Sequence, residues 1–305
     1  MPKINICICT YQRPKLLTDC LQSLASIVVP SETEVTVTVI DNDQTGSAEA
    51  TVTGLTETFP FNIYYHCEDK RGIPCARNRA VEETHRLGSD YLVFIDDDEW
   101  VEPLWLDKLY AYCQNQGGDI VVSGDVIPEL PDKTPEYMRP FFNQKQHPTG
   151  TLLGFCATNN VLSPIYLTKD LGLRFDESHP LAGGSDRRFF YEAVKAGVKI
   201  KKCAEALVHE SVPENRATLR WLSKRKFKGG TTIGWEEKQN GRSTLGIIYS
   251  AGRKLIIELF LAGIMFLVGN KYKQNKRWLK ACRHLGVLSG AFGLRVDSYK
   301  SVDGQ

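Results

Sequence analysis

The stretch Tyr91-Leu-Val-Phe-Ile-Asp-Asp-Asp-Glu99 decides the fold of this 305-residue chain. Its first five residues are apolar without alternation and rich in β-branched and aromatic side chains, which is typical of a strand buried on both faces. Three consecutive carboxylates, Asp96, Asp97 and Asp98, follow directly. Carboxylates at the end of a buried strand are costly unless a positive charge lies beside them, and a divalent cation shared with the phosphates of a ligand would supply it. An acidic turn that merely closes a core strand is the alternative.

The regions around this stretch alternate between strand and helix patterns. Strands are predicted at 4–9, 34–40, 62–66, 119–127 and 199–208, and a strand with a turn at 151–163. Helices are predicted at 14–26, 103–115 and 185–197, and residues 69–79 form a loop that turns into a helix running to about residue 87. Residues 128–150 contain five prolines and indicate an irregular surface loop. Strands that alternate with helices form βαβ units, so the sequence predicts an α/β fold with a mostly parallel sheet flanked by helices.

Polar side chains follow three of these strands: Thr10, Tyr11 and Arg13, then Asp41 and Asp43, then Asp96 to Asp98. The carboxyl ends of parallel strands meet at one sheet edge, where α/β proteins bind ligands, so we expect a nucleotide cleft there. Asp41 would accept a hydrogen bond from a base or ribose, and Tyr11 would stack. Arg77, with Lys70 or Arg71, would meet the phosphates. Each of these could singly be an ordinary loop or helix residue, so the prediction depends on their joint occurrence.

Two further residues stand at the ends of predicted elements. Asp186 lies in the first turn of a helix that follows Gly183-Gly184. It could be a carboxylate that favours the positive end of the helix dipole, or a general base at the lip of a cleft. His209 follows the last predicted strand. It could be a structural histidine, or it could complete a metal site begun by Asp98.

Amino-acid composition indicates the cellular compartment of the protein and the kind of surface it binds. Nine cysteines without metal-type spacing, and the lack of a signal peptide, indicate a reducing compartment, so we expect a cytoplasmic protein. The net charge of +2 conceals an asymmetry, because residues 212–305 hold 18 Lys and Arg against 6 Asp and Glu, whereas residues 1–211 hold 20 against 30. An acidic body with a basic, partly apolar tail suggests contact with an anionic surface. Nucleic acid is the rival partner, but no recognition motif supports it.

The motifs together resemble those of the large inverting glycosyltransferase family 2, whose GT-A fold is a Rossmann-like sheet flanked by helices. In chain order they are Cys9-Thr-Tyr-Gln-Arg13, Val39-Ile-Asp-Asn-Asp43, Arg71-Gly-Ile-Pro-Cys-Ala-Arg-Asn78, Phe94-Ile-Asp-Asp-Asp98, Gly183-Gly-Ser-Asp186 and Val208-His209. They occur in the family's order and cover about residues 3–211. The resemblance therefore implies that residues 1–211 form a catalytic domain that binds a nucleotide-sugar.

The resemblance also implies a role for each matching residue. The nucleotide-sugar would be contacted by Thr10, Tyr11, Arg13, Asp41, Arg77, Asn78, Asp96 and Asp97. Asp98 would be the direct ligand of a divalent metal, Mn²⁺ or Mg²⁺, with His209 a possible second ligand, and Asp186 would be the catalytic base. Ser185 stands where the family has Glu, which leaves the role of that accessory acid open. The chain lacks the Gln-x-x-Arg-Trp signature of processive synthases, so we expect one sugar per encounter, as in bacterial exopolysaccharide or lipopolysaccharide repeat-unit assembly.

Residues 212–305 are expected to form a basic, partly apolar helical extension. The basic and aromatic segment 216–228 could cover the donor diphosphate, lie against membrane phosphates, or be a solvated helix face. Residues 255–268 are nearly all apolar, but 14 residues fall short of the ~20 that span a bilayer. We expect an interfacial anchor with Trp278 and the neighbouring lysines at headgroup level, peripheral on the inner face of the cell membrane. A helix packed on the catalytic domain and a true span are the alternatives.

These observations predict an enzyme that moves a hexose from a nucleotide-diphospho-sugar, expected to be UDP-linked, to a hydroxyl of a lipid-linked glycan. A nucleotidyltransferase is one alternative, but it would need a Gly-rich basic loop where this chain has Thr10-Tyr-Gln-Arg-Pro14. A non-catalytic membrane adaptor is another. It would not need Asp96, Asp98 and Asp186 all to be present, as they are here.

Overall fold

The computed structural model describes residues 1–143, 146–181 and 183–294, and these fall into two units. The first comprises residues 1–127 with 146–211, and the second comprises residues 128–143 with 212–294. The sequence places residues 128–143 in the first domain. They belong with the second unit because Met138 packs against Leu222 and Leu279 in a small apolar cluster.

Four parallel strands form the half of the sheet that positions the site. They are β1 (Lys3–Thr10), β2 (Glu34–Asp41), β3 (Asn62–Cys67) and β4 (Tyr91–Asp96), in the spatial order β3-β2-β1-β4. The chain adds β2 and β3 on one side of β1 and then returns to add β4 on the other side. Such a switch in direction opens a crevice at the carboxyl ends of the strands. The register places Thr10 beside Asp41 and Cys9 beside Asp96, so the three predicted strand ends are level with one another.

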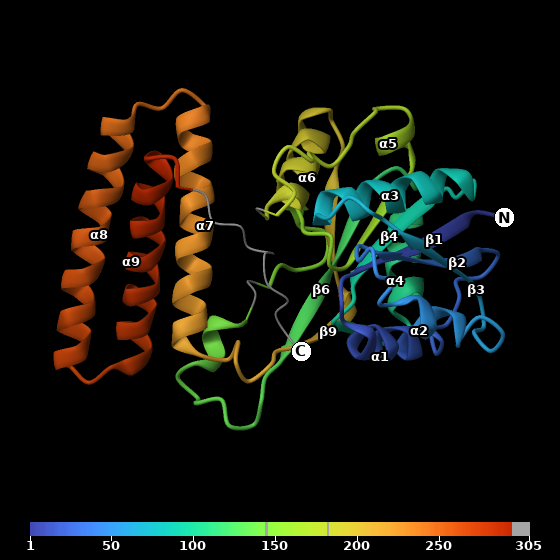
Figure 1. The fold of residues 1–305 in the computed structure, drawn as a ribbon, viewed down its shortest axis with the longest axis horizontal. Coiled ribbons are helices and arrows are strands. Elements are labelled where there is room, and N and C mark those ends of the chain that lie inside the picture. Colours follow the sequence, from blue (N-terminus) through green and yellow to red (C-terminus); the bar gives the residue numbers. More distant parts are fainter. Residues whose placement is uncertain (144–145, 182, 295–305) are drawn as a thin grey trace. The chain divides into compact units, whose positions relative to one another are not determined.

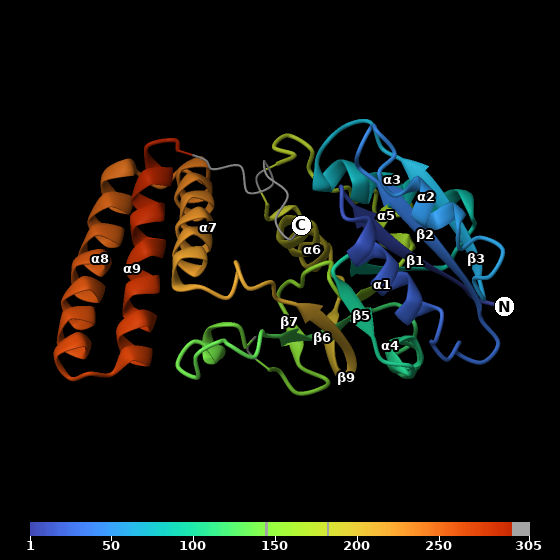
Figure 2. The same ribbon diagram turned by 60° about the horizontal axis from the view of Figure 1, so that its bottom comes forward.

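The other half of the sheet is largely antiparallel. Next to β4 lie β8 (Val161–Pro164), β6 (Val121–Glu129), β9 (Ile200–Ser211) and β5 (Glu99–Val101), and β7 (Leu152–Leu153) pairs with β9. Figure 2 shows β5, β6, β7 and β9 gathered at this end of the sheet. The predicted parallel arrangement thus holds for β1 to β4 only. In addition, β9 continues to Ser211, so His209 lies within a strand and not after its end.

Helices cover both faces of the sheet, as Figure 1 shows. One face carries α1 (Pro14–Leu24), α2 (Glu49–Thr53) and α4 (Trp105–Asn115), and the other carries α3 (Ile73–Arg86), α5 (Tyr166–Lys169) and α6 (Ser185–Lys195). Because strand side chains alternate, Ile4, Ile6 and Ile8 of β1 pack on the first face and Cys7 on the second. Each of these buried isoleucines contributes about 1.5–3 kcal/mol relative to an exposed one.

Asn160 fixes the junction between the two halves of the sheet. Its side-chain oxygen accepts a hydrogen bond from Trp105 Nε1 of α4 at 2.8 Å. Its side-chain nitrogen donates to the carbonyl oxygens of Asp125 in β6 and Ala206 in β9, at 2.8 and 2.9 Å. A buried amide with its donors and acceptor satisfied is rigid, so the strands beneath the site are held in a fixed arrangement.

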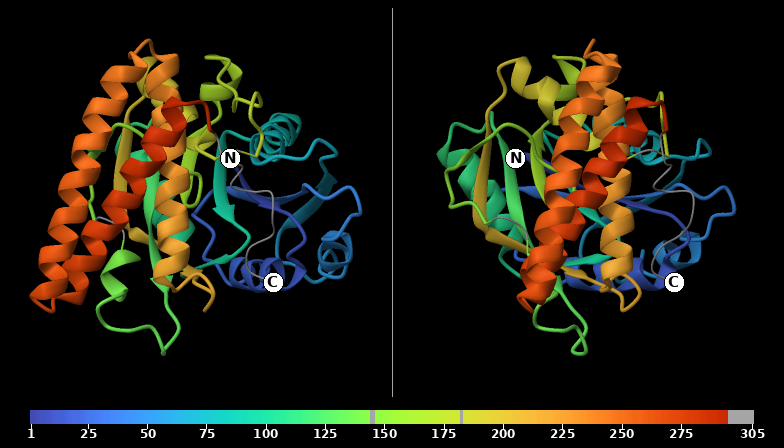
Figure 3. Two further views of the ribbon diagram at one scale, coloured as in Figure 1. Left: turned by 60° about the vertical axis from the view of Figure 1, so that its left-hand side comes forward. Right: turned by 90° about the vertical axis from the view of Figure 1, so that its left-hand side faces the viewer.

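The second unit contains three long helices, α7 (Leu219–Gln239), α8 (Thr244–Leu267) and α9 (Lys271–Ala291). They lie side by side with α9 between α7 and α8 (Figure 3). Glycines allow α7 and α9 to approach closely: a Cβ atom on Gly230 would lie 2.2 Å from the carbonyl oxygen of Arg283, and one on Gly286 would lie 2.1 Å from that of Phe227. Only glycine fits such a crossing. Among the described helices, none is both long and apolar enough to cross a bilayer.

Candidate functional site

The loop after β1 binds the acidic cluster, by which we mean Asp96, Asp97 and Asp98 at the end of β4. Thr10 Oγ1 donates to a carboxylate oxygen of the buried Asp97 at 2.7 Å. Arg13 Nη1 lies 3.1 Å from the other oxygen of Asp97 and 3.3 Å from Asp98. The positive charge that a carboxylate cluster requires is therefore supplied in part by the chain itself. Thr10 and Arg13, which we expected to contact the nucleotide, are bonded to the acidic cluster.

The acidic cluster remains short of positive charge even so. Burial, assisted by the charge of Asp98, raises the pKa of Asp96 to about 7, although the nearby Arg77 opposes this rise. Burial also raises the pKa of Asp97, opposed mainly by Arg13. A raised carboxyl pKa means that the negative charge is poorly compensated. The end of β4 is therefore suited to a ligand that brings a cation.

A divalent metal fits two of these carboxylates. Within the described ranges, no group of three or more His, Cys, Asp and Glu residues could hold a metal ion by itself. Mg²⁺ and metals like it often use one or two protein carboxylates and take their remaining ligands from water and substrate phosphates. Asp96 and Asp98, which are partly exposed and repel each other, match that requirement for an ion that arrives with a diphosphate.

His209 is engaged elsewhere. Its ring stacks on Trp100 of β5, with ring centroids 5.5 Å apart and planes at 12°. Its Nε2 atom lies 3.7 Å from a carboxylate oxygen of Glu102. The strand pairing explains this placement, because His209 is directly opposite Trp100 in the β5–β9 ladder. A metal role for His209 beside Asp98 stays a prediction, since stacking on the ring face leaves the in-plane nitrogen lone pairs able to bind a metal.

Glu99 is a site residue that the sequence did not single out. It is buried, and one carboxylate oxygen accepts the Asp96 backbone N–H at 2.9 Å. The other oxygen has no hydrogen-bond partner in the described part of the chain. Burial and the charge of Asp96 raise the pKa of Glu99 well above its usual range. Glu99 thereby shapes the turn that presents the acidic cluster.

Asp41 organises the loop after β2. Its carboxylate accepts from the backbone N–H groups of Ala48 at 2.7 Å and Asp43 at 3.1 Å, and from the hydroxyl of Tyr65 at 3.1 Å. Burial raises its pKa, and these hydrogen bonds oppose the rise. A contact with a base would have to compete with them or use an Asp41 lone pair that they leave open. Tyr11 is covered by Arg71, whose guanidinium carbon lies 4.6 Å from the ring centroid.

Arg77 connects the acidic cluster to α6. Its Nη1 atom donates to Ser185 Oγ at 3.0 Å, and its charge lowers the pKa of Asp96. One guanidinium thus lies between the strand that carries the carboxylates and the helix that carries Asp186. Of the other predicted phosphate contacts, Lys70 forms an ion pair with Glu177.

Asn78 holds the segment before α6. It is buried, its amide nitrogen donates to the Phe175 carbonyl oxygen at 2.9 Å and to Glu177 at 2.6 Å, and its oxygen accepts the Phe175 N–H. The amide is therefore used within the protein. Contact between Asn78 and a phosphate remains a prediction.

Asp186 stands in the first turn of α6, as expected. Gly183 and Gly184 precede it with φ values of 55° and 88°, a left-handed conformation that favours glycine, and this turn starts the helix sharply. One Asp186 oxygen accepts the backbone N–H of Arg187 at 2.8 Å. Its charge adds to burial in raising the pKa of Cys156, which indicates that the two groups are near each other. The carboxylate is partly exposed and can receive a proton.

Comparison with known proteins decides the family. The model of the family "Glycosyl transferase family 2" matches residues 5–165. The "Succinoglycan biosynthesis protein ExoM" of Rhizobium meliloti is 37% identical over 308 residues, which cover 97% of this chain and 95% of that protein. This chain belongs to glycosyltransferase family 2. The glycosyltransferase is also 29% identical, over 44% of its length and 42% of the relative's, to the "Glucosyl-dolichyl phosphate glucuronosyltransferase" of Haloferax volcanii.

Solved structures confirm the fold of this glycosyltransferase. The S. aureus TarS 1-349 complex with UDP matches with a TM-score of 0.54 at 14% identity, covering 95% of this chain and 91% of that one. The TarS 1-349 complex with UDP-GlcNAc matches with a TM-score of 0.51 at 15% identity, covering 97% and 95%. At such identities the likeness establishes the fold alone. The predicted GT-A fold and the transferase class are confirmed.

Proposed function

We propose that this glycosyltransferase moves a hexose from a UDP-linked donor to a hydroxyl group of a lipid-linked glycan, with inversion at the anomeric carbon. The observation that carries this proposal is the position of Arg77, which lies near Asp96 and bonds Ser185 beside Asp186. A leaving diphosphate at the acidic cluster and an attacking hydroxyl at Asp186 would then be on opposite sides of one sugar. The UDP complex of TarS supports the choice of UDP.

In the proposed reaction, the bond between the acceptor oxygen and the anomeric carbon forms while the bond from that carbon to the diphosphate breaks. Asp186 takes the hydroxyl proton, because it is an accessible carboxylate at the rim of the site. Arg77 offers its guanidinium to the phosphates, and Arg13 orients Asp97 and Asp98. A divalent metal would be held by Asp96 and Asp98 and would neutralise the charge of the leaving diphosphate.

The acceptor and the location follow from the second unit and from the relatives. The unit exposes large apolar side chains on α8 beside many lysines and arginines, as a surface that contacts an anionic membrane would. The relative ExoM acts in succinoglycan biosynthesis by its name. We therefore propose that the enzyme works peripherally at the inner face of the cell membrane, assembling an exopolysaccharide by adding one sugar per encounter.

The donor is tested by thermal stabilisation of the full chain with UDP, GDP, CMP and dTDP, each with and without Mn²⁺. We expect UDP to raise the melting temperature more than the other nucleotides, and Mn²⁺ to enlarge the rise because Asp96 and Asp98 repel each other without a cation. A larger shift with another nucleotide would replace UDP in the proposal. The lack of a shift with all four would contradict the proposed nucleotide cleft.

A further inference from the structure

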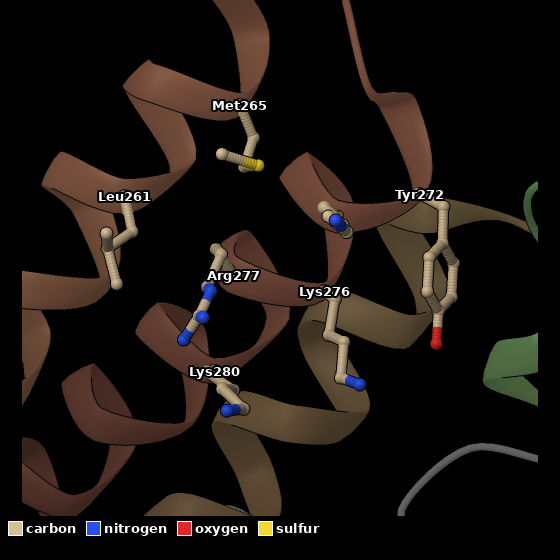
Figure 4. Close-up of a pocket in the computed structure, with 7 residues that line it drawn as sticks. Leu261, Met265, Tyr272, Lys276, Arg277 and Lys280 are labelled. Atoms are coloured by element: carbon tan, nitrogen blue, oxygen red, sulfur yellow. The ribbon is translucent and has the colours of Figure 1, made fainter. Parts of the chain in front are cut away.

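The second unit contains a pocket whose lining residues are not among the candidate catalytic residues. It lies between α8 and α9, near the turn that joins them, and has a volume of about 370 Å³. Figure 4 shows the side chains that line it, with Leu261 and Met265 from α8 and a group of basic residues from α9. We call it the α8–α9 pocket, and its basic residues are Lys273, Lys276, Arg277 and Lys280. Its volume is within the range of small-ligand sites.

The pocket has more positive than negative side chains. Glu258, which is only 8% exposed, lies 3.1 Å from Arg277 Nη1 and 3.6 Å from Lys280 Nζ. One carboxylate thus holds two of the four cations in place. Among the described residues, no carboxylate pairs with Lys273 or Lys276, and the Lys276 ammonium lies 5.7 Å from the ring centroid of Tyr272. The four cations that line the pocket outnumber the one carboxylate paired with two of them, so an anion in the pocket would compensate the excess positive charge.

The surroundings of the pocket indicate that the anion carries an apolar tail. The outer side of α8 presents a row of large apolar side chains that are 69–84% exposed, at Leu245, Tyr249, Ile256, Phe260 and Leu267. They recur at intervals of four and seven residues, so they form one stripe along the helix. Exposed Ile257 and Val268, with Leu261 of the pocket, extend the apolar surface from this stripe to the cations. A site for a free polar anion would not require these side chains.

We propose that the α8–α9 pocket binds the phosphate headgroup of an anionic membrane phospholipid while the exposed apolar side chains of α8 enter the adjoining bilayer. The lysines meet the phosphate, and Glu258 keeps Arg277 and Lys280 oriented toward it. This proposal rests on the membrane location given under the proposed function and adds the site and the chemical class of lipid. A lipid-linked diphosphate and a free phosphate present the same chemistry, so the test separates them.

The test measures binding of the full chain to phosphatidylcholine vesicles with and without phosphatidylglycerol. The pocket variant is Lys273→Gln with Lys276→Gln, which leaves the Glu258 ion pairs intact and should fold. The control is Lys224→Gln with Lys238→Gln, which removes the same charge from exposed positions of α7. We expect the wild type to bind only the anionic vesicles, the pocket variant to bind about thirtyfold more weakly, and the control to change about twofold. Thermal melting confirms that both variants fold.

Each other outcome has a definite meaning. Equal weakening of the pocket variant and the control would overturn the pocket as a specific site, although membrane contact would stand. Failure of the wild type to bind any vesicle would overturn both this inference and the proposed membrane location. Release from vesicles by inorganic pyrophosphate at low concentration would assign the pocket to diphosphates, and binding of an oligonucleotide in place of vesicles would assign it to nucleic acid. Asp186→Asn should bind vesicles as the wild type does, so a failure of the proposed transfer is distinguishable.

Discussion

The acidic cluster of the first unit and the α8–α9 pocket of the second both hold an excess of charge, which is negative in the cluster and positive in the pocket. Each gathers charges of one sign and supplies too few of the other sign. Arg13 and Arg77 lie beside Asp96 to Asp98, and Glu258 is paired with Arg277 and Lys280, two of the four basic residues of the pocket. In the acidic cluster, burial raises the pKa values of Asp96 and Asp97. The three lysines of the pocket are exposed, so water can solvate their charges. Burial therefore determines how strongly excess charge is opposed, because water solvates it at the exposed lysines and not at the buried carboxylates.

The largest effect on stability is expected from removing the Arg13 guanidinium, which is paired with the acidic cluster. Arg13→Met leaves Asp97 buried without its ion pair, and breaking such a pair costs about 3 kcal/mol of the free energy of unfolding. Urea denaturation measures the loss. The matched variant in the basic pocket, Lys273→Met, should cost less than about 0.5 kcal/mol because that side chain is exposed. Similar losses in the two variants would show that the clusters do not differ as described.

The pH dependence of stability sharpens the same comparison. The pKa of Asp96 is raised from its ordinary 3.8 to about 7 in the folded chain, so between these values the folded state binds more protons than the unfolded state. The free energy of unfolding must then fall as the pH rises through this window. Asp96→Asn removes this contribution, and we expect the wild type to lose about 2 kcal/mol more than the variant between about pH 5 and about pH 8. Parallel pH profiles of the two proteins would contradict the raised pKa.

A smaller effect is expected from the counter-charge of the pocket. Glu258→Gln leaves Arg277 and Lys280 without their carboxylate, which should cost about 1 kcal/mol, since both cations can reach water. The same change should tighten binding to anionic vesicles severalfold because the pocket becomes more positive. Glu237→Gln, which breaks the ion pair with Arg242, is the control for an equal change in charge. Weaker vesicle binding by Glu258→Gln alone would mean that orienting Arg277 and Lys280 matters more than the net charge.

Much of the parallel half of the fold could be predicted from the sequence. The strands β1, β2, β3 and β4 are Val-, Ile- or aromatic-rich runs, and Leu17, Leu21 and Leu24 mark the buried side of α1 at helical spacing. The polar residues that follow these strands could be placed at one edge of the sheet, because the carboxyl ends of parallel strands meet there. Strand β5 could not be predicted, because three residues are too few to show a pattern. The end of β9 was also missed, and with it the stack of His209 on Trp100.

The contacts that define the site were harder to predict than its residues. Arg13 and Asp97 lie 84 residues apart, and Arg77 and Ser185 lie 108 residues apart. No local pattern encodes such pairs. Glu99 could not be singled out, because in the sequence it only extends a run of three carboxylates. A signal was available for Arg13, since a buried Asp97 needs a cation and the sheet order brings the loop after β1 beside β4. Residues 295–305, which we included in the extension, lie outside the described residues.

The most direct test of the central claim, that Asp186 is the base across the site from the acidic cluster, is to measure transfer and UDP binding separately in Asp186→Asn. Glu192→Gln is the control, because it changes an exposed carboxylate of the same helix, which is paired with Lys195. We predict that Asp186→Asn lowers kcat about a thousandfold. Its Kd for UDP should change less than about twofold, since Asp186 does not touch the leaving group in the proposed arrangement. Comparable losses of transfer and UDP binding, or transfer that survives the substitution, would contradict the account.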